Sequence, residues 1–205
     1  MKVSEKTLEI NFCAQFPDVA GRTLIWFGLT QKQEARAGFD ACTKFGGRII
    51  LFQFKASCHS VGTARRFHAP HQQMINLKNR CRVSRSVFYV FPMVGTTREF
   101  SRDPNIISQS WLLDVASIPN IGSPTTRSGS LRKNRRHYID VTPPNALIHS
   151  DPVEVKVFEA SHFATEGIHY AEGIGGLFGN SFDEFWGYCK LFRRTAAGLV
   201  IINAV

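Results

Sequence analysis

A pair of adjacent glycines, Gly46 and Gly47, separates two β-prone runs and constrains the fold more than any other feature of the chain. A two-residue Gly-Gly loop favours a tight primed turn between antiparallel strands. Counting outward from this turn sets Asp40 directly across from Gln53. Opposite residues share one face of a sheet with their Cβ atoms about 5 Å apart. The sequence therefore predicts that a carboxylate and an amide meet at the open end of a hairpin.

The second strand of this hairpin adds a lysine to the same place. Side chains alternate along a strand, so Lys55 lies on the same face as Gln53. Residues 49–52 are apolar without interruption, which is typical of a strand buried on both faces of a sheet. A buried Asp or Lys is costly unless something pairs with it. We expect an acid, an amide and an ammonium to converge at one end of the hairpin.

The charge distribution points to a polyanionic partner. The formal net charge is +9, and no Asp or Glu occurs from residue 41 to residue 97. This acid-free stretch includes Arg65 and Arg66, and a second basic stretch lies in a Ser/Gly/Thr-rich segment that is typical of a surface loop, with Arg127, Arg132, Lys133, Arg135 and Arg136. Basic arms of this kind contact phosphates without reading sequence. We expect the partner to be a nucleic acid rather than a membrane. The alternative is that the positive charge serves only to keep the protein soluble.

The order of elements in the first half follows from periodicity and capping signals. Ser4 is expected to cap a helix with apolar residues every four positions, and this helix carries Glu9. A strand is expected at 23–28, then a short helix or turn that begins at Thr30 and carries Glu34. After the hairpin, a helix is expected at 71–81 and a strand at 86–91. The order is helix, strand, strand, strand, helix, strand.

The second half gives weaker signals. The pattern predicts a short helix at 110–118, strands at 137–141 and 153–158, a glycine-rich loop at 167–179, a helix that opens at Ser181, and a strand at 199–204. Seven aromatic residues between 170 and 192 are mostly at helical spacing, which is typical of a core. No linker or repeat interrupts the chain, so a single domain over residues 1–205 is expected.

Several classes of protein and site are disfavoured. No apolar run reaches the roughly 20 residues that a membrane span needs, and the polar start differs from a signal peptide, so a cytoplasmic protein without membrane contact is expected. Five cysteines at unrelated spacings indicate free thiols. Zinc ligation is disfavoured because only His68 and His71 are closely paired. These two histidines are instead expected to lead into a helix and to face solvent or phosphate.

The residues of the first half carry a resemblance to a known superfamily. A helix with Glu9, then Asp40 on one strand and Gln53-Phe54-Lys55 on the strand paired with it, resembles the PD-(D/E)xK nucleases, which include restriction endonucleases, junction resolvases and nucleases of bacterial antiphage defence. The resemblance spans residues 4–92. It implies an α/β fold with a central mixed sheet flanked by helices, built on a restriction-endonuclease-like αβββαβ core, with residues 93–205 as a C-terminal extension.

The resemblance also implies an activity and a set of site residues. Asp40 corresponds to the metal ligand, Lys55 to the catalytic lysine, and Phe54 would contribute its carbonyl oxygen. The implied cofactor is Mg²⁺ or Mn²⁺, and the implied reaction is hydrolysis of a phosphodiester, in DNA before RNA. The basic stretches, independently of the resemblance, predict that the nucleic acid is held by Arg65, Arg66, Arg132, Lys133, Arg135 and Arg136.

Gln53 departs from the commonest form of the motif. An amide in place of a carboxylate removes one negative charge from a hard-cation site. Either another acid completes the site, or the protein is a degenerate binder. Glu34 and Glu9 are the two candidates for that acid, and Glu34 is preferred because it lies six residues before Asp40. The alternative for Glu34 is a solvated partner of Arg36 or Lys32.

Two functions other than catalysis stay open. One is a nucleic-acid-binding module on the same fold without catalysis, which would differ from the enzyme in binding no divalent cation at Asp40. The other is a basic interaction subunit whose aromatic-rich C-terminal half contacts a protein partner. The sequence also leaves open whether the chain forms a homo-oligomer.

Overall fold

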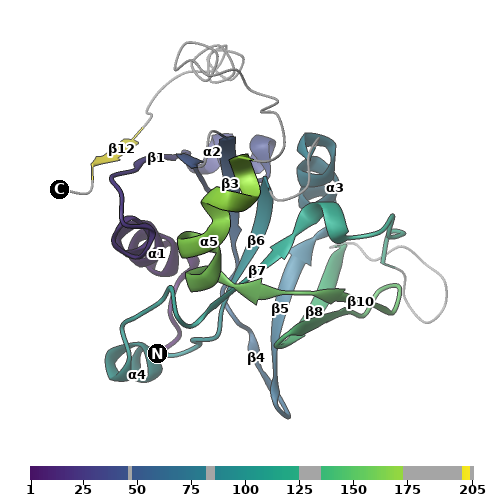
Figure 1. The fold of residues 1–205 in the computed structure, drawn as a ribbon. Helices are drawn as coiled ribbons and strands as arrows, with labels where there is room; N and C mark the ends of the chain where they lie inside the picture. The colour runs from purple at the N-terminus through teal and green to yellow at the C-terminus, as the bar shows by residue number, and fades with distance from the viewer. Residues whose placement is uncertain (46–47, 82–85, 125–134, 173–199, 204–205) are drawn as a thin grey trace.

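A mixed β-sheet forms the centre of the protein (Figure 1). The computed structural model describes residues 1–45, 48–81, 86–124, 135–172 and 200–203. The sheet has the strand order β11-β7-β6-β3-β2-β1, and β12 pairs with β1. Its strands are β1 (Ile25–Gly28), β2 (Ala41–Phe45), β3 (Arg48–Phe54), β6 (Val87–Pro92), β7 (Ser110–Asp114), β11 (Phe158–Glu159) and β12 (Val200–Asn203). Strands β3 and β6 are parallel, and the other neighbours are antiparallel.

The hairpin of β2 and β3 has the register that the sequence predicts. Phe45 pairs with Arg48, and Ala41 pairs with Phe52. One residue further out, the Asp40 N–H donates to the Phe52 carbonyl at 2.9 Å. The predicted cross-strand placement of Asp40 and Gln53 is therefore confirmed, while the turn residues 46–47 lie outside the described part of the chain.

A second sheet packs against one side of the first. It is antiparallel throughout, in the order β10-β9-β8-β5-β4. Its strands are β4 (His59–Val61), β5 (Ala64–Pro70), β8 (Arg136–Thr142), β9 (Asn145–Ile148) and β10 (Val153–Lys156). Strands β4 and β5 form a hairpin between β3 and the next helix that the sequence analysis did not predict. All three residues of β4 are exposed, so the segment lacks the apolar pattern that indicates a strand.

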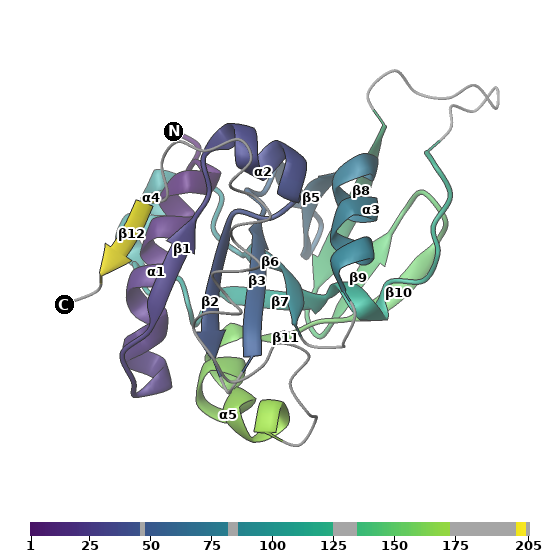
Figure 2. The ribbon, with the colours of Figure 1, turned by 90° about the horizontal axis from the view of Figure 1, so that it is seen from above.

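Five α-helices in the described part of the chain surround the sheets (Figure 2). They are α1 (Glu5–Ala20), α2 (Gln31–Ala37), α3 (His71–Arg80), α4 (Thr97–Arg102) and α5 (Ala160–Glu172). The expected N-cap of α1 is confirmed, since the Ser4 hydroxyl accepts from the Thr7 N–H at 3.0 Å. The expected helix after Pro70 is confirmed as α3. No helix in the described ranges is long and apolar enough to cross a membrane.

Two hydrophobic cores lie on opposite faces of the mixed sheet. On one face, the aromatic side chains of α1 pack on the sheet: the ring centroids of Phe12 and Phe52 are 5.6 Å apart, and those of Phe16 and Trp26 are also 5.6 Å apart. Helix α5 joins this core through Phe163. On the other face, Tyr89 and Phe91 of β6 pack with residues of α3 and of the second sheet. The mixed sheet is thus buried on both faces, as its continuous apolar runs require.

Two expectations for the second half are wrong. Residues 110–118 are not a helix: Ser110–Asp114 is strand β7, followed by a short 3₁₀ helix, η1 (Val115–Ser117). Leu112 and Leu113 are both buried, one in each core, as happens in a strand at the centre of a sheet. Of the glycine-rich loop expected at 167–179, residues 167–172 belong to α5 instead, and residues 173–179 lie outside the described ranges. The expected helix from Ser181 and its aromatic residues lie outside the described ranges.

The expected fold class is confirmed at a coarse level. The protein is an α/β protein with a mixed sheet flanked by helices and a five-stranded antiparallel sheet. The strands expected at 137–141 and 199–204 correspond to β8 and β12. The strand expected at 153–158 is divided between β10 and β11.

Candidate active site

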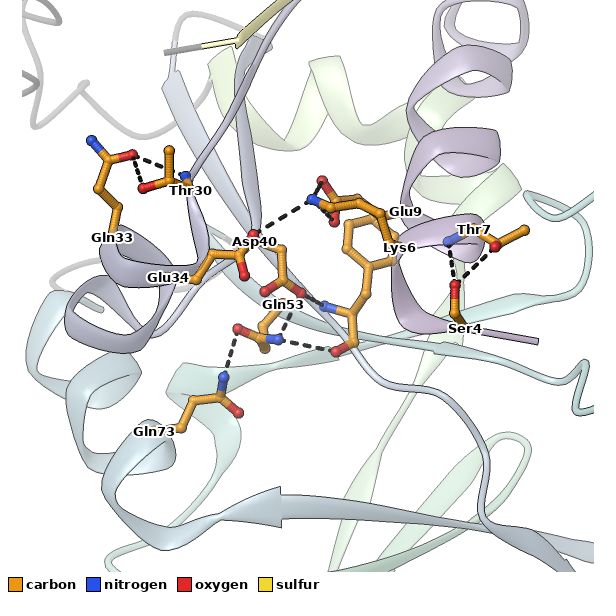
Figure 3. A network of polar contacts seen from close by, with 11 residues as sticks. Ser4, Lys6, Thr7, Glu9, Thr30, Gln33, Glu34, Asp40, Gln53 and Gln73 are labelled. Carbon is orange, nitrogen blue, oxygen red and sulfur yellow. Dashed lines mark hydrogen bonds and ion pairs between the residues drawn. The ribbon is translucent and has the colours of Figure 1, made fainter. Parts of the chain in front are cut away.

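The carboxylate of Asp40 lies at the open end of the β2–β3 hairpin (Figure 3). Its Oδ2 atom accepts from the Gln53 Nε2 at 2.6 Å and from the backbone N–H of Phe54 at 2.7 Å. The same Gln53 Nε2 donates to the Phe54 carbonyl oxygen at 3.0 Å. A carboxylate oxygen and a carbonyl oxygen therefore converge on one nitrogen. Gln53 is 1 % exposed, so this convergence takes place away from bulk water.

Gln73 of α3 fixes the orientation of the Gln53 amide. Its Nε2 donates to the Gln53 Oε1 at 2.8 Å, which leaves the Gln53 nitrogen to face Asp40. The Oε1 of Gln73 is itself buried and has no hydrogen-bond partner in the described structure. Buried amide groups without a partner are uncommon in folded proteins. Gln73 thus holds the Gln53 amide in this orientation, although its own Oε1 is left without a hydrogen bond.

The helix before β2 brings a second acid towards Asp40. Helix α2 begins after Thr30, as predicted, at a capping box in which the Gln33 Oε1 accepts from the Thr30 N–H at 2.9 Å. It ends at Gly38, whose φ of 82° is in the left-handed region that favours glycine. A Cβ atom at position 38 would also lie 3.2 Å from the Asn76 Cβ. The turn at Gly38 thus ends α2 four residues after Glu34 and two residues before Asp40.

Burial raises the pKa of Asp40 from 3.8 to about 7. The charge of Lys55 and the hydrogen bond from the Phe54 N–H oppose this shift, whereas the charges of Glu9 and Glu34 add to it. Asp40 is 7 % exposed, so water screens these charges poorly. A carboxylate that is buried among other acids and is only partly compensated is a common feature of functional sites.

Lys55 is buried beside this carboxylate, at the point where β3 ends. Its backbone N–H donates to the Val90 carbonyl at 3.1 Å, and its side chain is 6 % exposed. Its Nζ lies 3.9 Å from the Glu5 Oε1, and its charge lowers the pKa of Asp40. The ammonium is therefore held between an acid of α1 and the hairpin site.

Glu9 and Glu34 are joined by a lysine that the sequence analysis did not single out. Lys6 Nζ lies 2.9 and 2.8 Å from the two carboxylate oxygens of Glu9, and 3.5 Å from the Glu34 Oε1. Burial raises the pKa of Glu9, although Lys6 opposes the shift. Both acids act on Asp40 through their charge. The structure thus brings both candidate acids to the site, and Glu9 is the more buried of the two, with a side chain 5 % exposed against 22 %.

The donor atoms at this site suit a hard divalent cation. Carboxylate, carbonyl and amide oxygens are the ligands that Mg²⁺ and Mn²⁺ favour. Asp40 and the Phe54 carbonyl already converge on a hydrogen-bond donor, and Glu9 and Glu34 add negative charge near Asp40. No group of three or more His, Cys, Asp or Glu residues with metal-binding geometry occurs in the described ranges. A cation here would depend on the amide of Gln53 and on the backbone as well as on acids.

The histidines that were considered for zinc make other contacts. His71 is 9 % exposed, and its Nδ1 lies 2.8 Å from the Nε2 of the fully buried His137. The ring of His68 packs against Tyr138, with centroids 4.7 Å apart. The expectation that His71 faces solvent or phosphate is therefore wrong, because β8 covers it.

The arginines that were predicted to bind nucleic acid differ in their surroundings. Arg65 lies 2.9 Å from Glu99, and Arg66 makes two hydrogen bonds of 2.6 Å to Asp140. Arg135 and Arg136 are exposed at the start of β8, where the Arg135 carbonyl accepts from the N–H of His71 at the beginning of α3. Arg132 and Lys133 lie outside the described ranges. The exposed pair thus adjoins the helix that carries Gln73.

Sequence reasoning missed three residues of the site, namely Glu5, Lys6 and Gln73. The spacing of Lys6 and Glu9 on a helix could have indicated their ion pair. No local signal marks Gln73, since its contact depends on how α3 packs beside the end of β3.

No protein-family model, curated protein or solved structure matches this chain.

Proposed function

We propose that this protein is a metal-dependent nuclease of the PD-(D/E)xK type that hydrolyses phosphodiester bonds, with DNA as the favoured substrate. The observation that carries the proposal is the convergence of the Asp40 carboxylate, the Gln53 side chain and the Phe54 carbonyl, with Lys55 beside them. These groups are the ones that the resemblance assigns to a divalent cation and to its catalytic lysine, and their convergence supports the proposal.

The topology supports the same proposal. The elements α1, β1, β2, β3, α3 and β6 follow the order αβββαβ, with α2 and the β4–β5 hairpin inserted. Strands β1, β2 and β3 form an antiparallel meander, and β6 lies parallel to β3. Asp40 immediately precedes β2, Lys55 follows β3, and Glu9 lies on α1.

Each residue has a distinct role in the proposed reaction. Asp40, the Phe54 carbonyl and the Gln53 amide would hold Mg²⁺ or Mn²⁺, with charge from Glu9 and Glu34. A bound divalent cation polarises phosphoryl oxygens and lowers the pKa of a bound water. Lys55 would orient the attacking water and stabilise the negative charge that develops on the phosphate. The exposed Arg135 and Arg136 would contact the phosphate backbone.

A binding module without catalysis is the second candidate, and one observation favours it. The Gln53 amide directs its N–H₂ group, not its oxygen, at Asp40 and the Phe54 carbonyl. An N–H donor in this place satisfies the two oxygens without a cation. The amide must turn for Gln53 to act as a ligand, and Gln73 can accept from the turned amide through its own oxygen after the same rotation.

The test is a cleavage assay on supercoiled plasmid and on RNA, each with Mg²⁺, with Mn²⁺ and with chelator. The variant is Lys55→Met, which keeps an unbranched side chain in the buried position and removes the charge. The matched control is Lys44→Met, because Lys44 is exposed on the same hairpin. Circular dichroism would verify that each variant is folded.

We expect the wild type and Lys44→Met to cut in the presence of either metal and to stop with chelator, and Lys55→Met to lose cleavage. If the protein binds nucleic acid but shows no metal-dependent cleavage of any substrate, the nuclease proposal is wrong and the binding module without catalysis takes its place. Cleavage that persists in folded Lys55→Met would show that Lys55 has no catalytic role.

A further inference from the structure

Lys6 is an ammonium held among the acids of the candidate site (Figure 3). It contacts both oxygens of Glu9, from its own helix, and one oxygen of Glu34, from α2. Three carboxylate oxygens from two separate elements therefore surround one positive charge. The Lys6 ammonium is thus surrounded by carboxylate oxygens in the way that a bound metal cation would be.

The contact is more than an ordinary surface ion pair. The side chain of Lys6 is half exposed, at 53 %, but the Glu9 carboxylate that it meets is 5 % exposed. Burial opposes the charge on Lys6, yet the hydrogen bond and the charge of Glu9, together with Glu34, raise the pKa of Lys6. The ammonium is thus stabilised at the site, whereas isolated exposed pairs contribute little.

The charge balance shows what Lys6 does to the site. Glu9 and Glu34 together carry two negative charges, and Lys6 neutralises one of them. Without Lys6, both carboxylates would stand uncompensated beside Asp40, on whose pKa their charges already act. Two uncompensated carboxylates next to a first metal are suited to a second divalent cation, because carboxylate oxygens are ligands that Mg²⁺ and Mn²⁺ favour.

We propose that Lys6 is a built-in cation that fills the position between Glu9 and Glu34, so that the protein takes up one divalent cation, at Asp40, and accepts a second only when the Lys6 charge is removed. This inference rests on the proposed function for the Asp40 position alone. The Lys6 ammonium therefore limits the enzyme to one metal ion. Glu9 and Glu34 then act on that ion only through their charge, because both contact the Lys6 ammonium directly.

The experiment counts bound Mn²⁺ on the 205-residue chain by isothermal titration calorimetry and by electron paramagnetic resonance of the free ion. The test variant is Lys6→Met, which keeps the length of the side chain without its charge. The matched control is Lys32→Met, since Lys32 is an exposed lysine on α2 close to Glu34 in sequence. Lys6→Gln is a second neutral variant in case Lys6→Met does not fold.

We expect one Mn²⁺ per chain for the wild type and for Lys32→Met, and two for Lys6→Met. Adding Glu34→Gln to Lys6→Met should return the count to one, which would assign the second ion to this position. The same Glu34→Gln change in the wild type should leave the count at one.

The remaining outcomes separate the two proposals. One ion in both the wild type and the folded Lys6 variants would overturn the inference about Lys6 and leave the proposed function in place. No ion in the wild type but one in Lys6→Met would overturn the metal site at Asp40 while supporting the role of Lys6. No ion in any variant would overturn both.

Discussion

Asp40 and Asp140 are two aspartates with several hydrogen-bond donors each, but they lie in opposite electrostatic surroundings. Asp140, on the outer side of the second sheet, meets the Arg66 guanidinium at 2.6 Å and the His149 ring at 2.7 Å. Its hydrogen bond with Arg66 lowers the pKa of Asp140, whereas burial raises the pKa of Asp40. The Asp140 carboxylate is hydrogen-bonded directly to a cation, the Arg66 guanidinium, whereas the Asp40 carboxylate is hydrogen-bonded to the neutral N–H groups of Gln53 and Phe54.

The comparison separates structural polar groups from functional ones. A carboxylate that has a bidentate arginine partner is already satisfied and has little capacity for a ligand. A buried carboxylate that is held by an amide and a backbone N–H, with further acids nearby, retains unbalanced negative charge. The distinction depends on the partners, since both aspartates are largely buried.

The largest expected effect is on cleavage. Asp40→Asn should lower the cleavage rate at least about 100-fold, because losing one contact to the reacting groups typically has an effect of this size. Asp140→Asn should leave the rate within about twofold, although it removes the same charge. Initial rates on plasmid with Mn²⁺ would measure both. Equal losses in the two variants would show that the comparison does not identify the site.

The next effect is on stability as a function of pH. The folded pKa of Asp40 is raised from 3.8 to about 7, so its stabilising contribution is complete below about pH 4 and is lost as the pH rises towards 7. From pH 5 to pH 8, the wild type should lose about 2 to 3 kcal/mol relative to Asp40→Asn, because a tenfold change in proton affinity corresponds to about 1.4 kcal/mol.

Asp140 should behave in the opposite way. Its folded pKa is lowered, so its contribution is present above the unfolded pKa and is lost only as the pH falls through the folded value. The carboxyl group of Asp140 therefore stays ionised from pH 5 to pH 8, so the difference between the wild type and Asp140→Asn should change much less over this range than the difference for Asp40→Asn. Urea unfolding at each pH measures both differences. A constant difference for Asp40→Asn would contradict its raised pKa.

The smallest expected effect is on affinity for nucleic acid. Arg135→Gln with Arg136→Gln should weaken duplex binding by several-fold and reduce the salt slope by up to about 0.9 for each lost phosphate contact. Arg66→Gln should change the slope less, because Asp140 already pairs with Arg66. Fluorescence anisotropy over a salt series measures both. A larger change in slope for Arg66→Gln would move the binding surface away from the start of β8, towards the middle of β5 and β8 where Arg66 and Asp140 pair.

The sequence was sufficient for the hairpin site because local rules determine it. A Gly-Gly turn and the alternation of strand side chains place Asp40 opposite Gln53 without knowledge of the rest of the fold. Lys6 and Gln73 could not be found in this way, since their contacts depend on how α1, α2 and α3 pack around the hairpin. The β4–β5 hairpin was missed because β4 is exposed throughout and β5 buries only Phe67 and Ala69, so neither strand has a strong apolar pattern.

The hydrogen bond from the Phe54 N–H to the Asp40 side chain has a consequence for how the site can be observed. In a regular ladder this amide would bond to a backbone carbonyl, and its rate of hydrogen exchange would report opening of the sheet. Here the acceptor is a carboxylate oxygen, at 2.7 Å, that belongs to the candidate site. The exchange rate of this one backbone proton is therefore linked to the occupancy and protonation of the site itself. A deuterium label at Phe54 would act as an internal probe of the centre, without substrate and without any change to the chain.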